Sequence, residues 1–182
     1  GVLSLMSLAI DGYLATGDEP GPRADILTGR YACYDVYPAR DGRFLAVAAI
    51  EPAFYANLCR ALSLEPWIPH QLDDARQDEI RAAFRAAFAR RDRDEWIAEL
   101  APRDTCVSPV YTVSELARDA HLAERRSFQS AVHAERGTLR QLAPILAGAS
   151  REPPGRPLGA DSGDDAGELL RAAGLGDAEI ER

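Results

Sequence analysis

The sequence predicts an α+β fold, a small domain in which an antiparallel β-hairpin and further strands are packed by helices. Residues 34–39 and 43–50 flank the dipeptide Asp41-Gly42, which is a strong hairpin signal. Segments with helical spacing then follow one another along the chain. This order lacks the strand–helix–strand alternation of an α/β fold, and the sequence contains no Gly-x-Gly-x-x-Gly motif.

The second arm of the hairpin is apolar from Phe44 to Ile50, so we expect this strand to be covered on both faces. Glu51-Pro52 ends the strand and begins a helix, because proline is favoured at the first helical position. Four apolar residues form the inward stripe of that helix: Phe54, Leu58, Ala61 and Leu62.

Two more amphipathic helices are predicted over residues 74–90 and 92–100. Arg and Asp side chains line the outer side of the first, and Trp96 is buried by the second. Residues 106–112 have the pattern of a strand. Because proline cannot donate a main-chain hydrogen bond, Pro109 restricts that strand to an edge or a bulge.

The rest of the chain predicts a short helix with Ser114 as its N-cap and two strands at residues 127–133 and 138–145. A final acidic helix is expected to begin after Asp161-Ser162 and to end at Gly174.

We divide the chain into a linker helix and arm (1–30), the small α+β domain (31–145), and a C-terminal linker and helical tail (146–182). The helical pattern of the first part stops at Thr16-Gly17, before a stretch rich in Pro and Gly. The apolar faces of the two outer parts need a partner, and the chain starts at Gly1 without an initiator Met. Both features predict a piece of a larger assembly.

Composition excludes several functions. The chain has 182 residues, 46% of them hydrophobic and 27% charged, with a formal net charge of −8. This acidic balance argues against a nucleic-acid or membrane-surface partner. Every basic side chain is Arg. Without Lys, the chain can form no Schiff base, hold no pyridoxal phosphate and offer no P-loop lysine.

Metal ligands and activated thiols are not indicated either. Three cysteines form no Cys-x-x-Cys pair, and the three histidines are scattered, so we expect no metal site. The cysteines have the spacing of reduced thiols, which predicts a cytoplasmic protein. We expect Cys106, which precedes an apolar strand, to be a small core residue.

Glu51 is the candidate for chemistry. It lies where an apolar strand meets a helix, and such junctions expose functional groups. Apolar walls would raise the pKa of its carboxyl group, whereas the helix dipole would favour the anion. Such a carboxyl could act as a general acid or base. The alternative is that Glu51 only caps the helix.

Tyr34 and Asp35 lie on the first arm of the hairpin. Packing against neighbouring strands is the first expectation for Tyr34, and a ligand wall is the alternative. Asp35 points to the other face from Tyr34, and we expect it to be solvated.

Three motifs in order carry a resemblance to a known family. They are Tyr34-Asp35-Val36-Tyr37, then Asp41-Gly42-Arg43, then Ile50-Glu51-Pro52-Ala53-Phe54-Tyr55. The segments RDRDEW (91–96) and DTCVSPV (104–110) follow, with GADS at 159–162. The chain resembles the C-terminal half of the class III CoA-transferase family, in its alpha-methylacyl-CoA racemase branch.

The resemblance implies a longer protein whose large domain binds CoA and lies outside this sequence. It maps the family's small-domain glutamate onto Glu51, as one of two acid/base groups that exchange the α-proton of a thioester. It further implies an acyl surface formed by Leu27 and Ile50, with Tyr34 beside the glutamate. No separate cofactor is implied, since coenzyme A enters as part of the substrate.

The function expected from this resemblance is racemase-like α-proton exchange on a 2-methylacyl-CoA thioester. The resemblance also implies an interlocked homodimer, with each active site between two chains, and we expect the fragment alone to be inactive. One alternative is a CoA-transferase that moves CoA between carboxylic acids. Another is a noncatalytic dimerisation and docking module.

Overall fold

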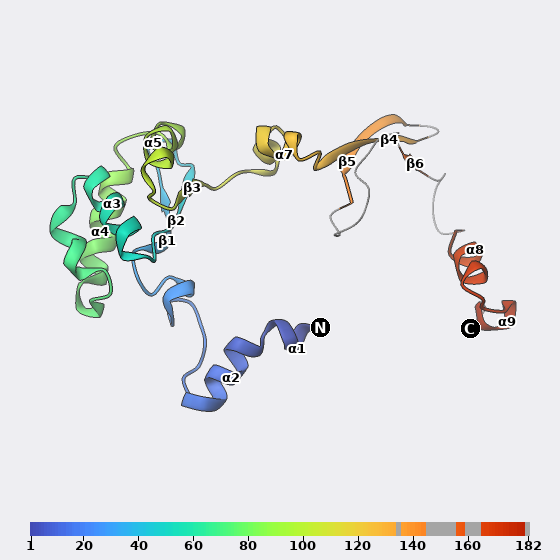
Figure 1. Cartoon of the computed structure of the whole chain (residues 1–182), viewed down its shortest axis with the longest axis horizontal. Coiled ribbons are helices and arrows are strands. Elements are labelled where there is room, and N and C mark those ends of the chain that lie inside the picture. Colours follow the sequence, from blue (N-terminus) through green and yellow to red (C-terminus); the bar gives the residue numbers. More distant parts are fainter. Residues whose placement is uncertain (134–135, 145–155, 159–164, 181–182) are drawn as a thin grey trace. The chain divides into compact units, whose positions relative to one another are not determined.

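The computed structural model describes residues 1–133, 136–144, 156–158 and 165–180. It forms two compact units, Gly1–Tyr111 and Thr112–Arg182 (Figure 1). Within the described residues, no helix is long and apolar enough to cross a membrane.

The first unit contains five α-helices and a three-stranded sheet. Its helices and strands are α1 (Val2–Leu5), α2 (Ser7–Thr16), β1 (Tyr34–Pro38), β2 (Phe44–Ala48), α3 (Pro52–Ala61), α4 (Gln77–Phe88), α5 (Arg93–Leu100) and β3 (Val107–Pro109). Short 3-10 turns join them: Ile26–Thr28, Glu65–His70, Asp74–Arg76 and Ala101–Arg103. The predicted α+β class is confirmed.

The hairpin of β1 and β2 forms as predicted. Its strands pair antiparallel from Tyr34 opposite Ala48 to Pro38 opposite Phe44. Gly42 has φ 75°, a left-handed conformation that glycine adopts without steric cost. The Asp41 carboxylate accepts a hydrogen bond from the Arg43 main-chain N–H at 3.1 Å and so stabilises the turn.

The third strand lies at the edge of the sheet, as Pro109 predicted. The strand order is β1-β2-β3, and β3 pairs antiparallel with β2. Both edge strands end in a proline, Pro38 in β1 and Pro109 in β3. Because proline has no main-chain N–H, neither edge strand leaves an unpaired donor at its last residue.

Helices cover one face of this sheet. The core brings together Tyr37 and Leu45 from the strands, Leu58 from α3, Phe84 from α4 and Trp96 from α5, all buried. The Trp96 indole donates a hydrogen bond to the Phe88 carbonyl at 2.9 Å. This places the polar edge of the ring in the core without an unpaired donor.

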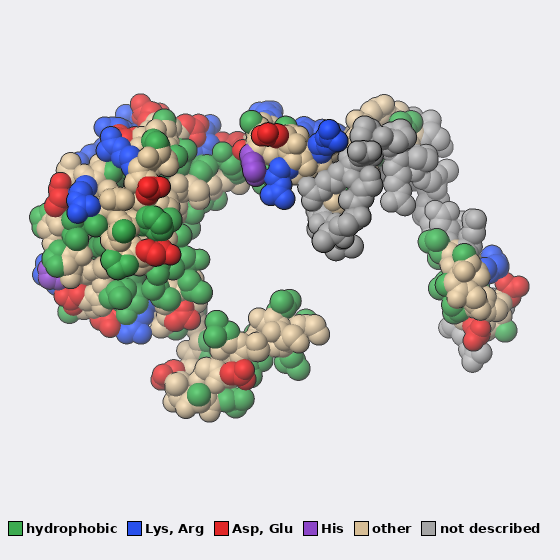
Figure 2. All heavy atoms as spheres, viewed as in Figure 1, with side chains coloured by type: hydrophobic (Ala, Val, Ile, Leu, Met, Phe, Trp, Pro, Cys, Tyr) green, Lys and Arg blue, Asp and Glu red, His purple; other side chains and the backbone are tan. Residues whose placement is uncertain are grey.

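Charged side chains of both signs are interspersed over the face of the first unit shown in Figure 2. Arg40, just before the hairpin turn, pairs with Asp92 at 2.8 Å and with Glu95 at 3.1 Å. The same two acidic residues form the capping box of α5. The hairpin tip is thereby tied to the start of α5, although each exposed pair contributes little to stability.

The second unit contains α6 (Val113–Leu116), α7 (Ala120–Glu124), β4 (Phe128–His133), β5 (Gly137–Leu142), β6 (Arg156–Leu158), α8 (Asp165–Ala172) and α9 (Asp177–Ile180). β4 and β5 pair antiparallel as predicted, and β6 joins β4 in parallel. The N-cap of α6 is Thr112, so the prediction of Ser114 was wrong. The Thr112 hydroxyl accepts a hydrogen bond from the Glu115 main-chain N–H, which starts the helix earlier. The predicted cap at Asp161-Ser162 lies outside the described residues.

Candidate functional site

One face of the three-stranded sheet is open. Along β2, Leu45 and Val47 are buried beneath the helices, whereas Phe44 and Ala48 are exposed. The prediction that this strand is covered on both faces was therefore wrong. An uninterrupted apolar run does not distinguish a strand buried on both faces from one whose second face is apolar and exposed. On β1, Val36 extends the same open face and is 49% exposed.

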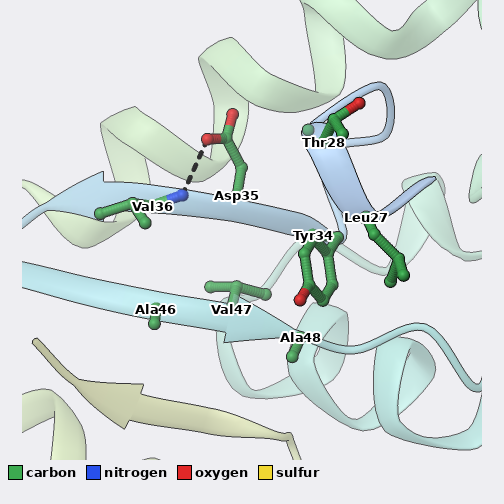
Figure 3. A pocket seen from close by; sticks show the side chains of 9 residues that line it. Leu27, Thr28, Tyr34, Asp35, Val36, Ala46, Val47 and Ala48 are labelled. Atoms are coloured by element: carbon green, nitrogen blue, oxygen red, sulfur yellow. Dashed lines mark hydrogen bonds between the residues drawn. The ribbon is translucent and has the colours of Figure 1, made fainter. Parts of the chain in front are cut away.

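A loop overhangs this apolar face and makes it a hollow. The hollow is lined by Leu27, Thr28 and Gly29 of the loop, Tyr34, Asp35 and Val36 of β1, and Ala46, Val47 and Ala48 of β2, and its volume is ≈ 340 Å³. In Figure 3 the Tyr34 ring lies beside Leu27 and near Ala48, whereas Asp35 points away from them. The loop is shaped by a capping box between Asp25 and Thr28 and by Gly29, with φ 89°. An apolar wall with one phenol suits an acyl group better than a charged ligand.

Asp35 is half-buried and ion-paired rather than freely solvated as predicted, with 25% of its side chain exposed. Its carboxylate pairs with Arg81 of α4 at 2.9 Å, and the Arg81 side chain is only 4% exposed. Arg81 also donates hydrogen bonds to the main-chain carbonyls of Gly29 at 2.7 Å and Arg30 at 3.2 Å. A buried cation thus joins β1 to the loop that carries Leu27.

Glu51 lies at the N-terminus of α3, and its side chain is exposed. Its backbone is extended, with φ −68° and ψ 135°, and its side chain makes no cap hydrogen bond. Glu51 is thus the N-cap residue of α3, as the capping alternative expects, but its side chain takes no part in the cap. The helix begins instead with Pro52 at its first position. The carboxylate is left available as an acceptor of hydrogen bonds or protons from a ligand, near the favourable end of the helix dipole.

The four predicted site residues fall into two groups. Leu27 and Tyr34 line the hollow together. Ile50, which is half-buried, and Glu51 follow the end of β2 and are not among the residues that line it. Ala48 connects the groups, because it lines the hollow and its carbonyl accepts a hydrogen bond from the Ile50 main-chain N–H at 2.9 Å.

Two buried polar residues near these groups were not singled out from the sequence. Arg81 has the spacing of the buried side of α4, four residues after Gln77 and three before Phe84, so the helical periodicity could have identified it. Gln71 lies in an irregular segment between two 3-10 turns. No periodic pattern marks it there.

Cys106 is exposed, so the prediction that it is a core residue was wrong. It has φ 49° immediately before β3, and its carbonyl accepts a hydrogen bond from the Ala48 main-chain N–H at 2.9 Å. Partial desolvation raises the pKa of its thiol, and the negative charges of Glu51 and Asp104 raise this pKa further. Cys106 therefore lies within the electrostatic reach of Glu51.

We expect iodoacetamide to modify Cys106 in the native chain and to spare Cys33 and Cys59. Both of the latter are buried, and burial raises the pKa of each thiol, that of Cys59 to about 11. Because the thiolate is the nucleophile, the Cys106 rate should still increase as the pH rises above 8. Peptide mass spectrometry after native and denatured labelling would measure this. Equal labelling of all three cysteines in the native chain would contradict it.

The sequence pattern of the family described as CoA-transferase family III matches residues 1–161. The chain belongs to CoA-transferase family III. It is 36% identical to the alpha-methylacyl-CoA racemase of Mus musculus over 161 residues, which cover 86% of this chain and 40% of that protein. It is also 36% identical to the alpha-methylacyl-CoA racemase of Homo sapiens over 105 residues, 57% of this chain and 28% of that protein.

Solved structures agree on the fold. A CAIB/BAIF family protein from Brucella suis superposes with a TM-score of 0.66 at 20% identity, covering 93% of this chain and 44% of that one. At such low identity the similarity shows the fold alone. This member of CoA-transferase family III thus spans less than half the length of the relatives that it matches.

Proposed function

We propose that this chain is the C-terminal part of a racemase-like enzyme that exchanges the α-proton of a 2-methylacyl-CoA thioester. The observation that carries the proposal is the exposed side chain of Glu51. This residue is the N-cap of α3 and follows β2, the strand that lines the apolar hollow. The family membership and the 36% identity to two alpha-methylacyl-CoA racemases support it.

The geometry suits one half of a two-base mechanism. Inversion at the carbon next to the thioester carbonyl requires removal of a proton on one face and return of a proton on the other. In this proposal Glu51 serves one face, and a base from the rest of the protein serves the opposite face. Between the two steps the electron pair lies on the enolate, whose oxygen needs hydrogen-bond donors from outside this chain.

In this proposal the acyl chain binds in the apolar hollow, where Leu27 and Tyr34 contact it. Leu27 is 53% exposed, so a bound acyl chain would cover apolar area that now meets water. Ile50 would contact the substrate between the hollow and Glu51. The interlocked homodimer implied by the family resemblance belongs to the same proposal.

The test uses the protein expressed from its complete coding sequence, incubated in deuterated water with one enantiomer of a 2-methylacyl-CoA. We expect deuterium at C2 and formation of the other enantiomer, measured by mass spectrometry and chiral separation. The isolated 182-residue chain should give neither, because it supplies only one of the two bases. Absence of deuterium from the product of the complete protein would exclude the proposal.

A CoA-transferase is the second candidate, favoured by the description of the family that matches residues 1–161. Such an enzyme would move CoA from the thioester to a free carboxylic acid without exchanging the α-proton. Adding an isotopically labelled acid to the same incubation separates the two functions. Label in the thioester pool without deuterium at C2 would identify the transferase.

A further inference from the structure

The main chain that leads into Glu51 is held at three consecutive carbonyl groups. The carbonyl of Glu51 accepts a hydrogen bond from the Tyr55 main-chain N–H at 3.0 Å, within α3. The two preceding carbonyls lie before the helix and have no partner in it. The side-chain amide of Gln71 donates to both, at 3.1 Å to Ala49 and 2.6 Å to Ile50. We call residues 49–51 the junction.

The Gln71 amide is itself fixed. Its side chain is buried, with 9% of the residue exposed. Gln77 donates hydrogen bonds to the main-chain carbonyls of Gln71 at 3.2 Å and Asp73 at 2.9 Å, and accepts one from the Ala32 N–H at 2.8 Å. The NH₂ group of Gln71 uses both of its donors on the junction. The reversed amide would place an oxygen against two carbonyl oxygens, so only one orientation satisfies the contacts.

We propose that Gln71 is a positioning residue, which fixes the Glu51 Cα–Cβ bond, and with it the region that the carboxylate can reach, by holding the two peptide groups before it. The peptide planes of Ala49 and Ile50 determine where the Glu51 Cα–Cβ bond points. The exposed Glu51 side chain makes no cap hydrogen bond that could orient it instead. This inference rests on the proposed function of Glu51, because the residue that it positions is the proposed base.

The pKa of the Cys106 thiol can report on the position of the Glu51 carboxylate, and its measurement needs no substrate. Desolvation is the main cause of the raised pKa of its thiol, and the charges of Glu51 and Asp104 add to it. The difference in Cys106 pKa between the chain with Glu51 and the Glu51→Gln chain therefore measures the Glu51–Cys106 coupling. It can be obtained from the pH dependence of iodoacetamide modification.

We expect this coupling to shrink in the Gln71→Met background, because Met matches the length of Gln but donates no hydrogen bond. The Gln71→Asn variant, whose amide is one methylene shorter and cannot reach both carbonyls, should give the same result and serves if the Met variant does not fold. The control is Trp96→Phe, which removes another buried donor to a main-chain carbonyl, that of Phe88 at 2.9 Å, between α4 and α5 and outside the hydrogen bonds of Gln71 and Gln77. It should leave the coupling unchanged.

In the complete protein, the same Gln71 substitutions should lower kcat of proton exchange by about 100-fold, the size expected from a 1 Å displacement of a reacting group. KM should change much less than kcat, because the Gln71 amide donates to the main chain of Ala49 and Ile50 and not to the residues that line the hollow. A small rise in KM would come through Ile50. Trp96→Phe should retain kcat.

The coupling and the proton exchange test separate claims: the positioning role of Gln71 and the role of Glu51 as a base. If the Glu51–Cys106 coupling is as large in a folded Gln71 variant as in the unsubstituted chain, the positioning role is overturned. This conclusion does not depend on which reaction the complete protein catalyses. A coupling that shrinks, together with proton exchange that survives Glu51→Gln, would support the positioning role and remove the proposed base. The circular dichroism spectrum of each variant establishes that it is folded.

Discussion

Replacing Glu51 by Gln in the complete protein should lower the rate of α-proton exchange by about 10²–10⁴-fold, the usual contribution of a general acid or base. The amide keeps the size of the side chain but cannot take or return a proton. Because Glu51 is exposed and makes no cap hydrogen bond, its substitution should leave the fold intact. The measurement is deuterium incorporation into a 2-methylacyl-CoA, with kcat and KM determined separately.

The matched control for this substitution is Glu65→Gln. Glu65 is also exposed, also begins a helical turn and is also followed by a proline, Pro66. It shares the local setting of Glu51 but does not follow the end of β2. We expect Glu65→Gln to exchange protons at the unsubstituted rate. Exchange that survives Glu51→Gln would exclude Glu51 as a base.

Replacing Arg81 by Met should lower the free energy of unfolding by about 3 kcal/mol, the low end of the cost of removing one partner of a buried ion pair, because water partly solvates the remaining Asp35 carboxylate. Arg81 is 4% exposed, and the Asp35 side chain that would lose its cation is 25% exposed. The carbonyls of Gly29 and Arg30 would lose donors as well. Guanidinium unfolding followed by circular dichroism would measure the loss.

Arg85→Met is the control, since Arg85 lies one turn further along α4 and is exposed. It should change the free energy of unfolding by no more than about 0.5 kcal/mol. The double variant Arg81→Met with Asp35→Leu should cost less than the sum of the two single variants, because no buried charge is left without a partner. Additive losses would show that the pair is not coupled.

Much of the fold could be predicted because its signals are local. The Asp41-Gly42 turn, Pro52 at the start of α3 and Pro109 in an edge strand each have a backbone requirement that the residue itself satisfies. Glu51 could be singled out for the same reason, since a junction between a strand and a helix is visible in the residue pattern.

The properties that could not be predicted depend on tertiary contacts. An apolar run does not reveal whether one or both faces of β2 are covered. The environment of Asp35 depends on Arg81, a residue 46 positions away. Gln71 meets the junction from a segment without periodicity, and only the folded chain brings the two together. The site is therefore a product of long-range packing more than of any motif.

The prolines that end β1 and β3 have a consequence for how the chain behaves at high concentration. A sheet grows by adding strands to a border whose amides and carbonyls are free, and both borders of this sheet are short and interrupted by a residue without an amide hydrogen. Fibril-like stacking from this sheet is thereby discouraged. Exposed apolar surface lies instead on side chains, among them four leucines of α1 and α2: Leu3, Leu5, Leu8 and Leu14.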